Sequence, residues 1–191
     1  MILFLPGAAG RAAFWQPVAE RLGAPHMLLS WPGLGGEPHD PRVRGLDDLV
    51  ERVLAQMEQP VELVAQSMGG RIAIEVVRRA PDKVRRLVLT ATSGGVPMPR
   101  AYDWRPDYRR NYPDAATWIA DPQPDLSAWI TRIAAPTLLL WGDADPISPV
   151  SVGEHLRSLL PDARLHVVRG GAHDLAVTHA DEVAREIAAH L

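Results

Sequence analysis

Six short apolar runs are spread along the chain, and most of the segments between them have the spacing of amphipathic helices. The runs are mostly continuous rather than alternating, which is typical of strands covered on both faces in a parallel sheet. The clearest helical stripe spans residues 46–57, where apolar side chains recur every three or four positions. Strand alternating with helix predicts an α/β fold, with a doubly wound and mainly parallel sheet of about six strands. The six runs are Ile2–Leu5, Met27–Trp31, Val61–Ala65, Arg86–Thr90, Thr137–Trp141 and Leu165–Val168.

Residues 94–135 interrupt this alternation. The segment has no strand pattern and many prolines, and it holds more than half of the aromatic residues of the chain. A long loop inside a compact domain is usually functional or disordered, and so many large rings argue against disorder. We therefore expect a short helical cap over the carboxyl edge of the sheet, within a single domain of residues 1–191. A surface excursion packed on itself is the alternative. The aromatic residues are Tyr102, Trp104, Tyr108, Tyr112, Trp118 and Trp129.

The bulk composition narrows the class of protein. With 191 residues, the chain is long enough for one domain with a sizeable core. Its formal charge of −3 gives no general attraction to nucleic acid, and it has no cysteine for disulfides, thiolate catalysis or Cys-ligated zinc. No run approaches the ~20 apolar residues of a membrane span, and the start lacks the basic residues of a signal peptide. These features predict a soluble cytoplasmic protein that binds neither nucleic acid nor membranes.

One serine stands where a strand pattern meets a helical one. The stretch reads VAQSMGG, so Ala65 and Gly69 lie two positions to either side of Ser67. This is the spacing of a nucleophile elbow, a strained strand-to-helix turn that exposes the serine hydroxyl, with alanine in place of the usual first glycine. The start of the helix would direct backbone N–H groups at the reacting centre. We predict that Ser67 is a nucleophile; a serine that only caps the helix is the alternative.

A serine nucleophile needs a base, and the base needs an orienting acid. His173 follows the last strand pattern and two glycines, which allow a loop to bring the imidazole over the sheet. The other histidines lie in helical, strand or connecting segments without this placement. The loop after the preceding run reads GDADPISP and offers Asp143 and Asp145. We predict Asp145 as the acid because it is past the turn, and Asp143 as a residue that caps the turn through its own backbone.

The first strand pattern ends in PGAAG, a loop with almost no side chains. The loop matches neither G-x-x-x-x-G-K-[ST] nor G-x-G-x-x-G, so no nucleotide cofactor is expected. We predict instead that the backbone N–H of Ala8 pairs with that of Met68 to stabilise an oxyanion. No H-E-x-x-H pattern occurs, and no metal is expected.

Together these pieces resemble the α/β-hydrolase superfamily over nearly the whole chain. The likeness is greatest to its small, capped, esterase-like members of the pimeloyl-ester hydrolase and menaquinone-pathway lyase type. The order Ser, Asp, His along the chain is that of the family. The resemblance implies that the second run lies beside the first, that the third to sixth follow outward, and that a cap covers the site. The resembling stretches are LPGAAG, SWPGLGGEP, VAQSMGGRIAIEVV, PTLLLWGDADPISP and GGAHDLAVTHADEVAREI.

Three features depart from the family pattern. Pro6 stands where the family commonly has histidine, the chain begins at what resembles the third strand of the family, and the cap is short. The second run then becomes a sheet edge, flanked by Pro25 and Pro32, so we expect a monomer or an edge-paired homodimer. The short cap predicts an open site that prefers short to medium acyl chains. Trp104 and Trp118 are candidate substrate contacts, with packing inside the cap as their alternative role.

The sequence thus predicts a serine hydrolase that cleaves carboxylic esters of a small molecule through an acyl-enzyme, without a cofactor. One alternative comes from Arg71, which resembles the carboxylate anchor of the menaquinone-pathway lyase and would suit a lyase or thioesterase acting on an anionic substrate. Gln66 stands where that lyase has tyrosine, and a solvent-facing arginine is the plainer interpretation of Arg71. The other alternative is a non-catalytic binding protein, which would usually lack one of the three predicted catalytic residues.

Overall fold

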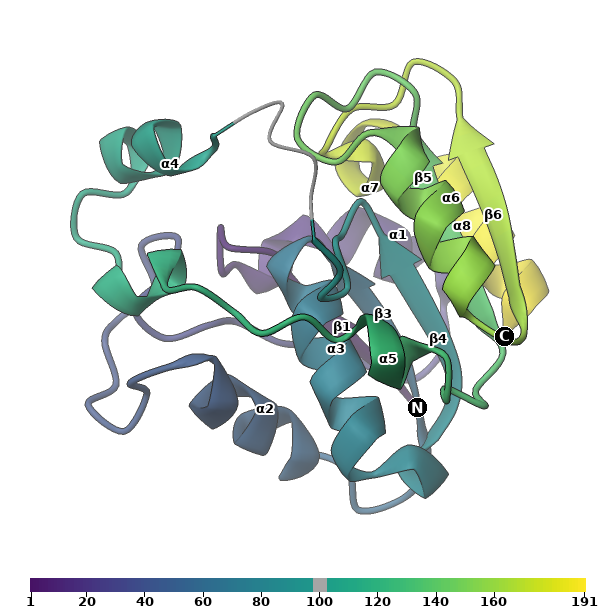
Figure 1. Cartoon of the computed structure of the whole chain (residues 1–191), viewed down its shortest axis with the longest axis horizontal. Coiled ribbons are helices and arrows are strands. Elements are labelled where there is room, and N and C mark those ends of the chain that lie inside the picture. The colour runs from purple at the N-terminus through teal and green to yellow at the C-terminus, as the bar shows by residue number, and fades with distance from the viewer. Residues whose placement is uncertain (98–102) are drawn as a thin grey trace.

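A computed structural model of the chain describes residues 1–97 and 103–191 (Figure 1). Tyr102, one of the aromatic residues noted above, lies outside the described residues. A single six-stranded sheet carries helices on both faces. The strands are β1 (Ile2–Leu5), β2 (His26–Leu28), β3 (Val61–Gln66), β4 (Val84–Thr90), β5 (Thr137–Gly142) and β6 (Ala163–Val168). The α-helices are α1 (Gln16–Leu22), α2 (Leu46–Leu54), α3 (Met68–Arg79), α4 (Arg105–Asn111), α5 (Ser127–Ile130), α6 (Val150–Leu159), α7 (Leu175–Thr178) and α8 (Ala180–His190), and the short 3-10 helices are η1 (Ala12–Phe14), η2 (Pro81–Lys83) and η3 (Thr117–Ala120).

All neighbouring strands are parallel, in the order β2-β1-β3-β4-β5-β6. This confirms the doubly wound parallel fold and its expected strand order, with β2 at one edge. The second apolar run, Met27–Trp31, leaves the sheet earlier than expected, after Leu28. The cause lies in Trp31, whose indole N–H donates to the Pro6 carbonyl at 2.8 Å and whose amide donates to the Gly10 carbonyl at 2.7 Å. The end of the run therefore packs on the loop after β1 instead of extending β2.

Alternate side chains of each strand enter two separate cores, one on each face of the sheet. In β1, Leu3 and Leu5 belong to the first core, whereas Ile2 and Phe4 belong to the second. Helices α2, α3 and α6 cover the first core, and α1, α7 and α8 cover the second. Both faces of the sheet are thus buried, which accounts for the continuous apolar runs of the sequence. Across residues 1–97 and 103–191, none of the helices combines the length and the apolar character that a membrane crossing requires.

Residues 103–135, here called the cap segment, lie in two places. The first part, with α4 and η3, reaches the carboxyl edge of the sheet, where the Tyr108 hydroxyl donates to the Ala8 carbonyl in the loop after β1. The second part differs from the expected edge cover, because α5 lies on the face of the sheet that α3 covers (Figure 1). Ile130 of α5 is fully buried in the first core. Only the first part of the segment is therefore close to the carboxyl ends of the strands.

Candidate active site

Ser67 occupies the turn between β3 and α3. Its backbone φ of 53° and ψ of −121° lie in a region that residues other than glycine rarely adopt, so the surrounding structure must hold the turn in place. Its neighbours have to be small. A Cβ on Gly69 would lie 2.5 Å from the Pro6 carbonyl oxygen, and one on Gly70 would lie 2.5 Å from the Thr92 side chain. These glycines let α3 begin directly against the ends of β1 and β4.

Three side chains from separate loops form a hydrogen-bonded series at the carboxyl edge of the sheet. The imidazole Nε2 of His173 lies 3.0 Å from Ser67 Oγ, and its Nδ1 lies 2.8 Å from Asp145 Oδ2. The carboxylate is buried, and its Oδ1 accepts the backbone N–H groups of Ile147 at 2.8 Å and Ser148 at 3.0 Å. An ionised carboxylate only accepts, so Nδ1 carries the proton and the Nε2 lone pair faces the hydroxyl. The arrangement can therefore take a proton from Ser67.

Asp143, the other candidate acid, contacts the backbone of another loop and not the His173 imidazole. Its Oδ1 accepts the N–H of Gly170 at 2.6 Å, so it links the loop after β5 to the loop after β6. The local turn cap expected from the sequence is therefore wrong. The two loops lie very close together, since a Cβ on Gly142 would lie 2.0 Å from the Gly171 carbonyl oxygen. Asp143 therefore meets a backbone N–H of the neighbouring loop instead of one in its own turn. This contact ties together the two loops that carry the carboxylate and the imidazole.

Replacing Asp143 with alanine is expected to lower the free energy of unfolding by about 1 kcal/mol, because one hydrogen bond is lost while water can reach the exposed Gly170 amide. Thermal unfolding followed by circular dichroism should show a midpoint lower by about 2–4 °C. Asp143→Asn keeps an acceptor oxygen and should unfold close to the wild type. Equal midpoints for the alanine variant and the wild type would mean that this bond does not stabilise the fold.

The loop after β1 forms a tight turn beside the serine. The Gly10 amide donates to the Gly7 carbonyl at 2.9 Å, which places Ala8 in the centre of the turn. A Cβ on Gly7 would lie 3.0 Å from the Cβ of Ser67, so only glycine lets the turn approach this closely. On the other side of the serine, the Met68 amide belongs to the first turn of α3, where N–H groups have no acceptor within the helix. Both expected oxyanion donors thus lie on segments next to Ser67.

Two buried tryptophans, which the sequence analysis did not single out, hold this turn from the body of the protein. The indole N–H of Trp15 donates to the Leu5 carbonyl at 3.0 Å, and that of Trp31 donates to the Pro6 carbonyl at 2.8 Å. Both rings are buried, at 0% and 1% exposure. In the sequence each one looks like an ordinary core residue, because apolar spacing does not reveal which backbone carbonyl an indole meets.

A cavity of about 1470 Å³ opens beside Ser67, between the carboxyl edge of the sheet and the cap segment. Trp104 and Trp118 both line it. Trp118 also packs against the first core, and its Nε1 is buried without a hydrogen-bond partner in the described ranges. The cavity is larger than the ~300–1,000 Å³ of most small-molecule sites, in keeping with an open cleft. Among the described residues, no three His, Asp or Glu side chains are grouped so that they could hold a metal ion.

Comparison with known proteins places this architecture in a family. A model of the alpha/beta hydrolase family matches residues 2–132. The chain belongs to this family. A second model, for the alpha/beta hydrolase fold, matches residues 112–180, so the two together cover most of the chain. The family assignment confirms the resemblance inferred from the five sequence stretches.

Similar proteins of known activity include esterases. This alpha/beta hydrolase is 26% identical to a pimeloyl-[acyl-carrier protein] methyl ester esterase of Chromobacterium violaceum, over 100% of this chain and 93% of the relative. It is 28% identical to a poly(3-hydroxyalkanoate) depolymerase of Ectopseudomonas oleovorans, over 96% of this chain and 81% of the relative. Among solved structures, a thermophilic esterase from Thermogutta terrifontis superposes with a TM-score of 0.81 at 19% identity, covering 97% of this chain and 87% of the other. This last likeness shows the shared fold.

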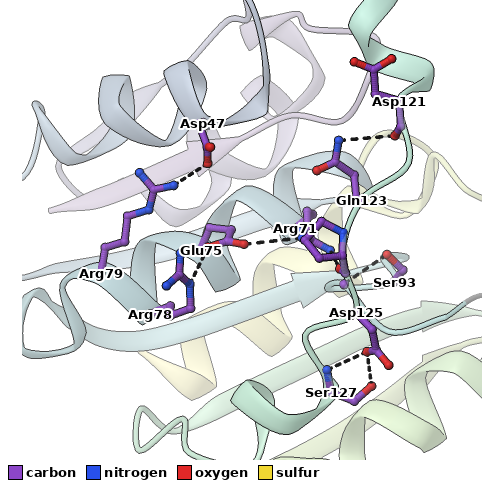
Figure 2. A network of polar contacts seen from close by, with 12 residues as sticks. Asp47, Arg71, Glu75, Arg78, Arg79, Ser93, Asp121, Gln123, Asp125 and Ser127 are labelled. Carbon is purple, nitrogen blue, oxygen red and sulfur yellow. Dashed lines mark hydrogen bonds and ion pairs between the residues drawn. The ribbon is translucent and has the colours of Figure 1, made fainter.

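In this alpha/beta hydrolase Arg71 is buried, which rules out the alternative interpretation of a solvent-facing side chain. Its Nη1 donates to the Pro124 carbonyl at 2.7 Å, and its Nη2 lies 3.5 Å from Glu75 Oε1. Figure 2 shows Glu75 between Arg71 and Arg78, which donates to the second carboxylate oxygen at 2.7 Å. Burial lowers the pKa of Arg71 from its ordinary value, and the neighbouring Glu75 opposes that shift. Arg71 therefore ties α3 to the cap segment, and it also lines the cavity.

Gln66, which the sequence analysis noted only as a departure from one relative, bridges two loops of the site. Its Nε2 donates to the His173 carbonyl at 3.2 Å. A Cβ on Gly7 would lie 2.3 Å from its Oε1, so the amide also packs against the turn after β1. The side chain is buried, and it helps to set the separation between the imidazole loop and that turn.

Proposed function

We propose that this hydrolase is a serine esterase that cleaves carboxylic esters of small molecules through an acyl-enzyme. The observation that carries the proposal is the 3.0 Å separation of His173 Nε2 from Ser67 Oγ, with the other ring nitrogen held by a buried carboxylate. A hydroxyl, an imidazole and a carboxylate in this order are the parts of a nucleophile, its general base and the orienting acid. The esterase relatives support an ester as the substrate.

In the first half of the proposed reaction, Ser67 Oγ attacks the ester carbonyl while His173 Nε2 takes its proton. Asp145 stabilises the imidazolium that forms. The negative charge that develops on the carbonyl oxygen is met by the N–H groups of Ala8 and Met68. The tetrahedral intermediate then collapses, the imidazolium protonates the departing alcohol, and the acyl group remains on Ser67.

The second half repeats these roles with water in place of the hydroxyl. His173 removes a proton from the water, which attacks the acyl carbonyl, and the proton then returns to Ser67 Oγ as the acid leaves. The same two N–H groups stabilise the second oxyanion. No step requires a cofactor or a metal. On the sequence argument we expect this reaction in the cytoplasm, in a monomer or homodimer whose residues 1–191 form one domain with a cap.

The open cavity supports a preference for short to medium acyl chains. Each methylene that becomes buried contributes about 0.8 kcal/mol, but a long chain in an open cleft stays partly in water and gains little of this. On p-nitrophenyl esters we expect the highest kcat/KM for butyrate and hexanoate, and a lower value for dodecanoate, because its additional methylenes gain little from burial. Rapid mixing should show a burst of p-nitrophenol close to one equivalent per chain.

The Ser67→Ala variant serves as the blank in this assay and should show no burst. A higher kcat/KM for dodecanoate than for hexanoate would contradict the acyl preference but leave ester hydrolysis standing. If the wild type cleaved none of the esters, the esterase proposal itself would fail, and the two alternatives, chemistry on an anionic substrate and a non-catalytic binding role, would have to be tested in its place.

Chemistry on an anionic substrate, as in a lyase or thioesterase, is the second candidate. The burial of Arg71 at the cavity, with its Nε unpartnered in the described part of the chain, is the observation in its favour. Against it, both terminal nitrogens of the guanidinium already meet Pro124 and Glu75. The esterase therefore remains the better-supported proposal. An acyl-thioester in the same substrate panel compares hydrolysis of a thioester with hydrolysis of an ester.

A further inference from the structure

The turn after β1 is anchored at both of its ends by the body of the protein. The two indole N–H groups described above hold the carbonyls of residues 5 and 6, and the Trp31 amide holds the Gly10 carbonyl at 2.7 Å. Between these anchors, the Gly10 amide fixes the Gly7 carbonyl. Because a trans peptide directs its N–H opposite to its C=O, this bond turns the Ala8 N–H out of the turn.

The centre of the turn is held from the opposite side, by the cap segment. The hydroxyl of Tyr108 in α4 donates to the Ala8 carbonyl at 2.7 Å, across 100 positions of sequence. The loop after β2 packs against the same turn, since a Cβ on Gly35 would lie 1.3 Å from the Ala9 carbonyl oxygen. The hydroxyl group thus meets the turn at a junction where the backbone is already closely packed.

The ring of Tyr108 is held by the aromatic residues that flank α4 on either side. Its centroid lies 5.6 Å from that of Trp104 in an edge-to-face arrangement and 5.0 Å from that of Tyr112. Burial raises the pKa of Tyr108 to about 12, so the hydroxyl keeps its proton at any pH at which an esterase is assayed. A permanent donor on a fixed ring can restrain the backbone that it contacts.

We propose that Tyr108 is a positioning residue that aligns the Ala8 N–H with the reacting carbonyl and so couples the cap segment to the oxyanion site. The inference rests on the proposed esterase function and deepens it. Tyr108 acts through the backbone of Ala8, not on the substrate: it holds the Ala8–Ala9 peptide by its carbonyl, and this restrains the adjoining Gly7–Ala8 peptide, which carries the Ala8 N–H. Its effect must therefore appear in the stabilisation of the oxyanion and not in the binding of the ground-state ester.

The test is Tyr108→Phe, which keeps the ring and removes only the hydroxyl. Loss of an oxyanion donor typically lowers kcat by about 10²–10³-fold, and a donor that is still present but less well held should cost less, about tenfold. We expect kcat on p-nitrophenyl butyrate to fall by about this factor with KM nearly unchanged. The inhibition constant of butylboronic acid, whose tetrahedral adduct carries an oxygen in the oxyanion position, should rise by a similar factor.

A control variant and a second measurement distinguish a specific effect of the Tyr108 hydroxyl from a general loosening of the cap segment. Tyr112→Phe removes the hydroxyl of the residue directly after α4, for which residues 1–97 and 103–191 offer no hydrogen bond, and it should leave kcat and the inhibition constant near wild type. Hydrogen exchange of the peptide that contains Ala8 should be faster in Tyr108→Phe than in Tyr112→Phe, a readout that does not depend on activity.

An unchanged kcat and an unchanged boronate affinity in Tyr108→Phe would overturn the inference while leaving the esterase intact. A raised KM with kcat unchanged would also overturn it, because the hydroxyl would then act in ground-state binding. If the wild type hydrolysed no ester, the proposed function would fail and this inference with it.

Discussion

Ser67→Ala and His173→Ala are each expected to lower kcat on p-nitrophenyl butyrate by about 10⁶-fold, and the double variant should be no slower than either one. The Ser67 hydroxyl and the His173 imidazole act in the same step, with Oγ and Nε2 3.0 Å apart. Once either side chain is removed, the other can no longer contribute to the attack on the ester. A residual rate above that of the uncatalysed hydrolysis of the ester is expected, because the oxyanion donors and the cavity remain. Steady-state assays of the three variants at high enzyme concentration, with substrate blanks, provide the measurement.

The double variant tests whether Ser67 and His173 act together as nucleophile and base. Losses that simply multiply in the double variant would show that the two side chains act independently, and a different base would then have to be sought. A His173→Ala variant that kept its rate while Ser67→Ala lost it would point to the same conclusion. Circular dichroism of each variant shows whether a loss of activity reflects unfolding.

Asp145→Asn is expected to lower kcat by about 10⁴-fold with little effect on KM. The Asp145 Oδ1 atom accepts two backbone N–H groups, from Ile147 and Ser148, so in the variant the amide oxygen takes this place. The amide NH2 then faces His173 Nδ1, which has to become an acceptor. The ring proton moves to Nε2, where it blocks transfer from the serine hydroxyl.

Asp143→Asn is the matched control, because it makes the same chemical change two residues away in the same loop. Its oxygen can still accept from the Gly170 amide, and we expect its kcat to stay within about threefold of the wild type. If Asp143→Asn lost activity and Asp145→Asn kept it, the assignment of the acid would be reversed.

The fold was largely predictable because every strand and most helices leave a local pattern. The continuous runs and the helical stripes together predict a doubly wound parallel sheet, and the structure confirms it. The exceptions have nonlocal causes. The early end of β2 depends on hydrogen bonds from Trp31 to the loop after β1, and α5 joins the first core through Ile130. Neither contact can be read from the spacing of apolar residues.

The site was predictable where a backbone rule fixes a residue type. Small residues flank Ser67 because α3 starts against neighbouring backbone, and this constraint is visible in the sequence. The sequence also favoured Asp145 over Asp143, and the structure brings the Asp145 carboxylate to the imidazole. The residues that it missed act through partners that are distant in sequence. Gln66 meets the His173 loop, and Tyr108 meets the turn after β1, and no local pattern marks either contact.

The central claim is that Ser67 becomes covalently modified with the help of His173. Its most direct test is intact-mass measurement and peptide mapping after treatment with a fluorophosphonate, which reacts with activated serine hydroxyls. We predict one adduct per wild-type chain, located on Ser67, with no adduct in Ser67→Ala and much slower labelling in His173→Ala. An adduct on another residue, or esterase activity that persists in a chain that carries none, would contradict the account.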